Sequence, residues 1–156
     1  MNSKIDIHTE KIIESYDVHT SLFSKIIEGI IERDLHHFIP GSNQIPWLIG
    51  SQVQLRYEAA SWMGINKKQK AEALFRNNKE VQHDITYPSV TSFNEDWKRI
   101  SPILRNAILE LDDEDLFTYS EKEPGKRGTF YDLLSHIIQR ETNCIAMITL
   151  WRGILT

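Results

Sequence analysis

The segment GTFYDLLSHIIQRETNCIAMITLWRG, residues 128–153, decides the fold that the sequence predicts. It predicts a long helix, because side chains of one kind recur along it in steps of three and four. The members of this series are Phe130, Leu133, Ile137, Arg140, Cys144, Met147 and Trp151. Arg140 is the charged member, and burying a charge without a partner is costly. Either the helix turns Arg140 towards water, or another segment brings an acid to it.

The second predicted helix contains a suitable acid. It begins near Ser42 or Asn43 and ends before Gly64, which is typical of a residue that stops a helix. Its core series is Leu48, Ser51, Leu55, Glu58 and Trp62. Ser51 and Glu58 lie two turns apart on one face, so a polar pocket between this helix and the last one is expected.

Two further long helices complete the predicted core. The first spans residues 9–31, with a series of Ile13, Tyr16, Thr20, Phe23, Ile27 and Ile30. The third spans residues 89–111, with a series of Phe93, Trp97, Ile100, Leu104, Ile108 and Leu111. Ser89 is its predicted N-cap, Pro102 predicts a kink without a break, and Thr129 with Asp132 predicts a capping box at the last helix.

The connections between these helices differ in length. Residues 66–87 have a poor, polar pattern that allows one short helix at 67–75, and they predict a long crossover between helices two and three. Residues 112–115, all acidic, predict a solvated turn, and residues 121–128 predict a loop or small hairpin. The chain is therefore expected to form one all-α domain over residues 1–156, a four-helix bundle.

Composition narrows the class of protein. The chain has 156 residues and one cysteine, so it can form no internal disulfide and no CxxC motif, which favours a cytoplasmic location. The net charge of −4 and the short basic cluster at residues 67–70 argue against a nucleic-acid partner or an anionic membrane partner. A polar start and the lack of an apolar run long enough for a bilayer argue against secretion and membrane insertion.

Several segments, taken in order, resemble the DinB/YfiT-like superfamily of metal-dependent proteins. They are PGSNQIPWLIG at 40–50, YPS at 87–89, ELDDEDL at 110–116 and TFYDLLSHIIQRET at 129–142. The resemblance covers nearly the whole chain, and the order and spacing of the segments carry it. It implies a bundle of up-down-down-up form, often dimeric, that holds a divalent metal on three histidines. A homodimer is therefore expected.

The resemblance places the three metal-ligand positions at Ser51, Arg140 and Cys144, and His136 matches a histidine that is usually not a ligand. None of the three positions is a histidine here. A serine hydroxyl is a poor ligand, and an arginine offers only donors and repels a cation. We therefore expect no metal ligands and no cofactor. The alternative is an atypical Zn, Ni or Mn site made from His136, Cys144 and Glu58.

Two hypotheses follow for the residues of the expected pocket, Ser51, Glu58, His136, Arg140 and Cys144. In the first, Arg140 replaces the metal, pairs with Glu58 and receives a small anionic ligand, a carboxylate or a phosphate. In the second, which we favour, Arg140 and Glu58 form an internal ion pair that only holds two helices together. Cys144 is either a nucleophile or a small buried apolar residue, and His136 is either a general base or a packed histidine.

The function expected from these observations is that of a metal-free relative of the superfamily, which binds a small molecule or acts as a dimeric accessory protein. The alternative is a metal-dependent thiol transferase or hydrolase with atypical ligands. A module that binds a protein partner through an exposed helix face is a third class, but no feature of the sequence points to it. Catalytic residues and the identity of a substrate do not follow from the sequence.

Overall fold

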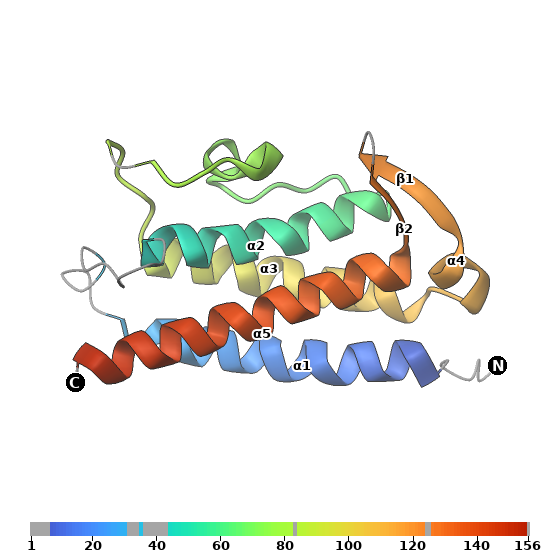
Figure 1. Ribbon diagram of the computed structural model, residues 1–156, viewed down its shortest axis with the longest axis horizontal. Coiled ribbons are helices and arrows are strands. Elements are labelled where there is room, and N and C mark those ends of the chain that lie inside the picture. Colours follow the sequence, from blue (N-terminus) through green and yellow to red (C-terminus); the bar gives the residue numbers. More distant parts are fainter. Residues whose placement is uncertain (1–6, 31–34, 36–43, 83, 124–125, 156) are drawn as a thin grey trace.

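The computed structural model describes residues 7–30, 35, 44–82, 84–123 and 126–155, and the protein is predominantly helical. The four long helices are α1 (Ile7–Glu28), α2 (Ile45–Trp62), α3 (Val90–Leu109) and α5 (Phe130–Leu155). In Figure 1, α1 and α5 run in one direction, whereas α2 and α3 run in the opposite direction. A long connection over residues 64–88 joins α2 to α3 on the outside of α2.

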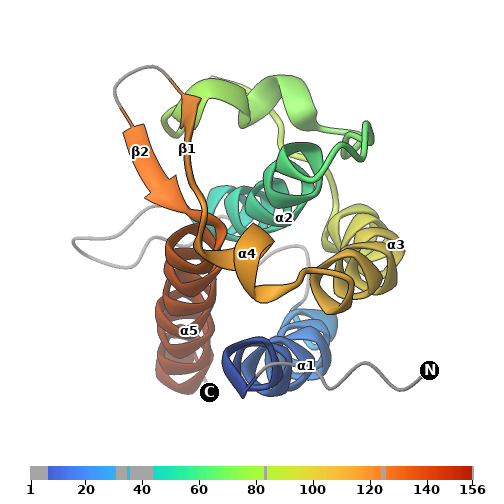
Figure 2. The ribbon, with the colours of Figure 1, turned by 90° about the vertical axis from the view of Figure 1, so that its right-hand side faces the viewer.

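The long helices enclose a single core. α1 and α2 each pack against both α3 and α5, so the four helices form the corners of a square in the end-on view of Figure 2. The core contains the apolar series predicted for the first and third helices, including Phe23, Ile27, Trp97 and Leu104. These two helices therefore face inward with the surfaces that the sequence predicted.

The helix ends follow local capping signals. Ser89 Oγ accepts a hydrogen bond from the Ser92 amide at 3.1 Å, so the predicted N-cap of α3 is confirmed. The Thr129 amide donates to Asp132 Oδ2 at 3.2 Å, and the Asp132 amide donates to Thr129 Oγ1 at 3.1 Å, which confirms the capping box of α5. α2 begins at Ile45, and the predicted caps at positions 42 and 43 lie outside the described residues. α3 continues through Pro102 without a break.

The long connection is tied to α2 by close packing and hydrogen bonds. It begins at Gly64, whose φ of 83° lies in the left-handed region that glycine adopts readily. The ring of Phe75 lies against Gly50, where a Cβ atom would overlap it. Gln69 Nε2 donates to the Gly50 carbonyl at 3.2 Å. The short helix predicted at 67–75 is replaced by two 3-10 turns, Glu72–Leu74 and Arg76–Asn78.

The acidic segment and the hairpin lie at the end of the molecule where α5 begins. Instead of a simple solvated turn, the acidic segment forms the short helix α4 (Asp113–Phe117), and a capping box between Asp112 and Asp115 starts this helix. The predicted hairpin is present as the antiparallel pair β1 (Tyr119–Glu123) and β2 (Lys126–Thr129). Within the described residues, no helix has both the length and the apolar character needed to cross a bilayer.

Candidate functional site

A buried arginine occupies the centre of the helical core. Arg56 of α2 has no exposed surface, and its guanidinium carbon lies 3.8 Å from the ring centroid of Tyr16 and 3.8 Å from that of Trp97. The rings come from α1 and α3, so three helices meet at this cation. Aromatic faces attract a cation most strongly when water is excluded. These two rings therefore offset part of the free-energy cost of burying the Arg56 charge.

Polar groups from the other helices satisfy the guanidinium. Its Nε atom donates to Glu141 Oε2 at 2.7 Å and its Nη2 atom donates to Glu141 Oε1 at 3.1 Å, a two-point pairing of planar groups. Its Nη1 atom donates to Thr20 Oγ1 at 2.7 Å and to Ser101 Oγ at 2.9 Å. Nη2 also donates to the Tyr16 carbonyl at 3.4 Å. With all five donors used, the group has no capacity left for a ligand.

His19 links the buried carboxylate to the protein surface. Its Nδ1 atom lies 3.1 Å from Glu141 Oε1, and its Nε2 atom lies 3.2 Å from Thr142 Oγ1. Thr142 is exposed on α5, and its hydroxyl also donates to the Ile138 carbonyl at 3.1 Å. We call Arg56, Glu141, His19, Tyr16 and Trp97 the core charge cluster.

The charges within this cluster support one another. Burial alone would raise the pKa of Glu141, but Arg56 and His19 hold the pKa of this carboxyl below its ordinary value of 4.5. Burial raises the pKa of the Tyr16 phenol to about 12, so this group stays neutral. The cluster therefore contains an ionised carboxylate beside a permanent cation, in the interior of the protein.

The ion pair that the sequence predicted is wrong in both of its members. Arg140 is exposed and makes no ion pair with Glu58, which is half-buried and accepts a hydrogen bond from Gln54 Nε2 at 3.3 Å. The buried pair is instead Arg56 with Glu141, so the base lies on α2 and the acid on α5.

The rotation of α5 about its axis explains this error. Its buried side chains are Leu134, Ile137, Glu141, Cys144, Ile145, Ile148 and Trp151. This series turns Arg140 outward and its neighbour Glu141 inward. On α2 the buried series likewise passes through Gln52 and Arg56, whereas Ser51 and Glu58 are only half-buried.

Two of the five candidate residues come together. Ser51 Oγ donates to the Leu48 carbonyl at 3.0 Å, and Cys144 Sγ donates to the same carbonyl at 3.6 Å. Burial raises the pKa of the Cys144 thiol to about 12, with a further contribution from Glu141 and an opposing one from Arg140. The thiol is therefore protonated at neutral pH, which suits a small buried residue and opposes its use as a nucleophile or a metal ligand.

The residues present do not fit the metal that the resemblance implies. His136 is exposed on α5, whereas Cys144 is buried, so the alternative site of His136, Cys144 and Glu58 does not assemble. In the part of the chain that the structure describes, no three His, Cys, Asp or Glu side chains are grouped so that they could hold an ion. Ser51 and Arg140 supply no donor set in their place.

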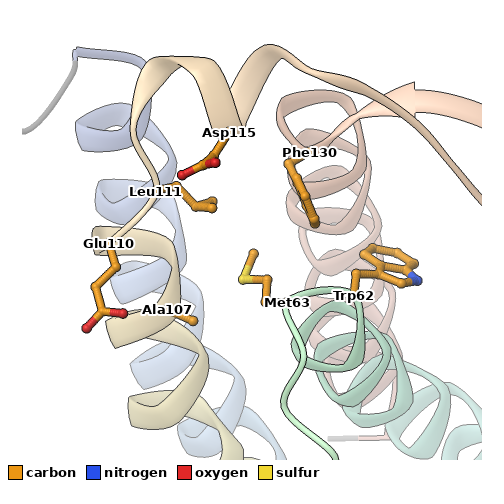
Figure 3. Close-up of a pocket in the computed structure, with 7 residues that line it drawn as sticks. All are labelled: Trp62, Met63, Ala107, Glu110, Leu111, Asp115 and Phe130. Carbon is orange, nitrogen blue, oxygen red and sulfur yellow. The ribbon is translucent and has the colours of Figure 1, made fainter.

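A cavity of about 390 Å³ lies at the end of the molecule where α2 and α3 finish and α5 begins. Its described lining consists of Trp62, Met63, Ala107, Glu110, Leu111, Asp115 and Phe130, drawn in Figure 3. None of the five predicted pocket residues lines this end cavity. The sequence contained an indication of this cavity. Its lining residues lie at the predicted ends of the second and third long helices and at the predicted start of the last helix.

Comparison with models of known protein families and with curated proteins finds no match for this chain. The resemblance to the DinB/YfiT-like superfamily therefore stays a prediction from the sequence segments. The residues that sequence reasoning missed are Arg56, Glu141 and His19 in the core, and Glu110 and Asp115 at the end cavity.

Proposed function

We propose that this protein is a DinB-like homodimer that works without a bound divalent metal and binds a small molecule as an accessory protein. The path of the chain supports this proposal, since α1 and α5 run opposite to α2 and α3 and a long connection follows α2. This is the up-down-down-up order that the superfamily implies.

The observation that carries the metal-free part of the proposal is the state of the three inherited positions. The Ser51 hydroxyl and the Cys144 thiol both donate a hydrogen bond to the Leu48 carbonyl, so both are neutral, protonated groups. The third position, Arg140, carries a permanent positive charge on the surface. A divalent cation would meet no lone-pair donor of useful strength and would be repelled by the guanidinium.

The end cavity supports the binding part of the proposal. Ligand pockets are typically concave, mostly apolar, and contain few polar groups, with volumes of roughly 300–1,000 Å³. The end cavity lies within this range at about 390 Å³, and its described lining combines apolar side chains with the acidic side chains of Glu110 and Asp115. The sequence predicted an anionic ligand at Arg140. An anion is not expected in the end cavity, because the charged residues of the described lining are the acids Glu110 and Asp115.

Metal analysis of protein purified without a histidine tag tests the proposal. We expect no stoichiometric metal and no rise in melting temperature with Zn²⁺, Ni²⁺ or Mn²⁺. Stoichiometric metal that is lost in Cys144→Ala would support the alternative, a metal-dependent thiol transferase or hydrolase. Size-exclusion chromatography with light scattering tests the homodimer, and a monomer at all concentrations contradicts it.

A gain-of-binding variant tests whether the inherited positions are correctly assigned. The triple variant Ser51→His, Arg140→His, Cys144→His restores the three histidines that the superfamily uses. We expect it to bind one Zn²⁺ or Co²⁺ per chain, with a Co²⁺ absorption spectrum of nitrogen ligation. A control with His at positions 51 and 140 alone should bind more weakly. A folded triple variant that binds no metal would show that the superfamily's site is misplaced on this chain.

A further inference from the structure

The end cavity has apolar and aromatic walls. Trp62, Met63, Leu111 and Phe130 are each half-buried, and all four also pack against the hydrophobic core. In Figure 3 these side chains surround the opening between the end of α2, the end of α3 and the start of α5. The side chains at the opening are therefore anchored to the core, and such preorganisation lowers the entropy cost of binding an apolar body.

The charge at this cavity is negative. Glu110 and Asp115 are the charged members of the described lining, and both are exposed. The Glu110 carboxylate makes no hydrogen bond or ion pair with another described residue, and the Asp115 carboxylate accepts only the Asp112 amide at 3.4 Å. No Lys, Arg or His belongs to the described lining. Among the described lining residues there are therefore two carboxylates at the cavity and no cation to pair with them.

The helix ends add to this negative charge. α2 ends at Trp62 and α3 ends at Leu109, and both place their carbonyl ends beside the cavity. The carbonyl end of a helix carries about half a negative charge. α5 brings its positive end to the same place, but the Thr129–Asp132 capping box sets a carboxylate on its first turn. The charges and helix ends of the described residues at the end cavity therefore favour a cation.

We propose that the end cavity binds a small organic cation, an amine carried on an apolar or aromatic body. This inference rests on the proposed function, because it names the class of small molecule that the protein binds. The apolar body packs between Met63, Leu111 and Phe130, while the ammonium group lies at the rim beside the Asp115 carboxylate. The Glu110 carboxylate, on the outer side of α3 in Figure 3, adds a longer-range attraction. The face of Trp62 adds a further attraction for the cation.

Three indole probes of similar size and different charge test the proposal. Tryptamine is a cation, indole-3-ethanol is neutral, and indole-3-propionate is an anion at neutral pH. Each is titrated into the full chain and followed by ¹H–¹⁵N correlation NMR, with the Trp62 indole signal assigned through Trp62→Phe. We expect tryptamine to shift the signals of the cavity residues and to bind more tightly than the neutral probe, by about two- to fivefold for each carboxylate. This preference should decrease as salt is added.

Matched variants locate the effect. Glu110→Gln and Asp115→Asn should each weaken tryptamine binding about two- to fivefold and leave binding of indole-3-ethanol unchanged. Glu110→Gln is the primary variant, because Asp115 also belongs to the capping box of α4. Asp84→Asn is the control, since Asp84 is an exposed acid in the connection before α3 and is not among the described lining residues of the cavity. It should bind tryptamine as the wild type does.

The contrary outcomes separate this inference from the proposed function. Equal or tighter binding of the neutral or the anionic probe would overturn the cation, while the protein would still be a small-molecule binder. Failure of all three probes to shift the cavity signals would overturn the end cavity as the binding site. Stoichiometric metal in the untagged protein would instead contradict the proposed function, whatever the probes do.

Discussion

The core charge cluster combines aromatic rings, a carboxylate and a cation. The described lining of the end cavity has the rings and the carboxylates but lacks the cation. In the core, aromatic rings and a carboxylate surround the Arg56 guanidinium, with 3.8 Å to each ring centroid and 2.7 Å to Glu141. At the end cavity, Trp62 and Phe130 supply rings, and Glu110 and Asp115 supply carboxylates, but the lining contains no cation among its described residues. The buried charges of the core are paired within the protein, whereas at the end cavity the cation that we propose would supply the missing charge.

This difference indicates how each place contributes. In the core, removal of Arg56 or Glu141 leaves the other group buried without its main charge partner, so the cluster acts on stability and on the arrangement of the helices. At the end cavity the carboxylates remain in water. Removing one of them should change the free energy of unfolding little and should mainly affect the affinity for a cation. Stability measurements and binding measurements should therefore separate the two places.

The largest effect is expected when the internal cation is removed. Arg56→Met leaves the buried Glu141 with His19 as its remaining charge partner and should destabilise the protein by about 3–5 kcal/mol. Urea unfolding followed by circular dichroism measures this change. Arg140→Met is the matched control on the surface of α5, and it should change the free energy of unfolding by less than about 0.5 kcal/mol.

A double variant distinguishes a lost charge pair from lost packing. Arg56→Met with Glu141→Leu removes both charges and should recover much of the stability lost in Arg56→Met alone. A cost for Arg56→Met no greater than that of Arg140→Met would contradict the buried pair. The comparison between core and cavity would then have no energetic basis.

The next effect concerns acid. The pKa of Glu141 in the folded protein lies below its ordinary value of 4.5. As the pH falls, the unfolded chain therefore binds a proton at this residue at a higher pH than the folded protein does. The stabilisation by Glu141 is therefore complete above about pH 5 and is lost as the pH falls through 4.5 towards the lower folded value. Urea unfolding at a series of pH values should show this loss in the wild type.

Variants at two glutamates check the origin of this acid effect. Glu141→Gln should be less stable at neutral pH and should lose less stability between about pH 5 and pH 3. Glu14→Gln, at an exposed position of α1, should retain the wild-type slope. An unchanged slope in Glu141→Gln would mean that other carboxyl groups cause the acid sensitivity.

The elements of the fold were predictable because their signals are local. Ser89, Gly64 and the Thr129–Asp132 pair act within a few residues of the chain, and each lies at a helix end as expected. α1 and α3 also carry most of their apolar residues on one side, which indicates the face that each turns inward, although Val18 and Leu22 of α1 are exposed. The hairpin after α4 was likewise indicated by its Pro and Gly content.

The rotation of α2 and α5 was not predictable in the same way. Both helices carry apolar residues on several sides, so a series through Arg140 and one through Glu141 both fit a spacing of three and four. Only contacts with residues far along the chain, such as His19 and Arg56, decide between them. The sequence predicted an ion pair between Glu58 and Arg140, and this prediction is wrong, because the pair that joins these two helices is Arg56 with Glu141.

The smallest expected effect on stability is also the one with an unusual sign. Glu110 is the C-cap of α3, where its negative charge lies at the negative end of the helix, and Asp115 lines the same cavity. An unfavourable charge at a helix end costs about 0.3–1 kcal/mol. Glu110→Gln should therefore raise the free energy of unfolding by an amount in this range, measured by urea unfolding at low salt.

A variant that is more stable yet binds a cation less well would show that Glu110 is kept at some cost to the fold, as is common for binding residues. Asp84→Asn, at an exposed bend outside the helices, should leave stability unchanged within error. If Glu110→Gln instead destabilises the protein, Glu110 makes a stabilising interaction in the folded state. The end cavity would then contribute to stability, as the core charge cluster does.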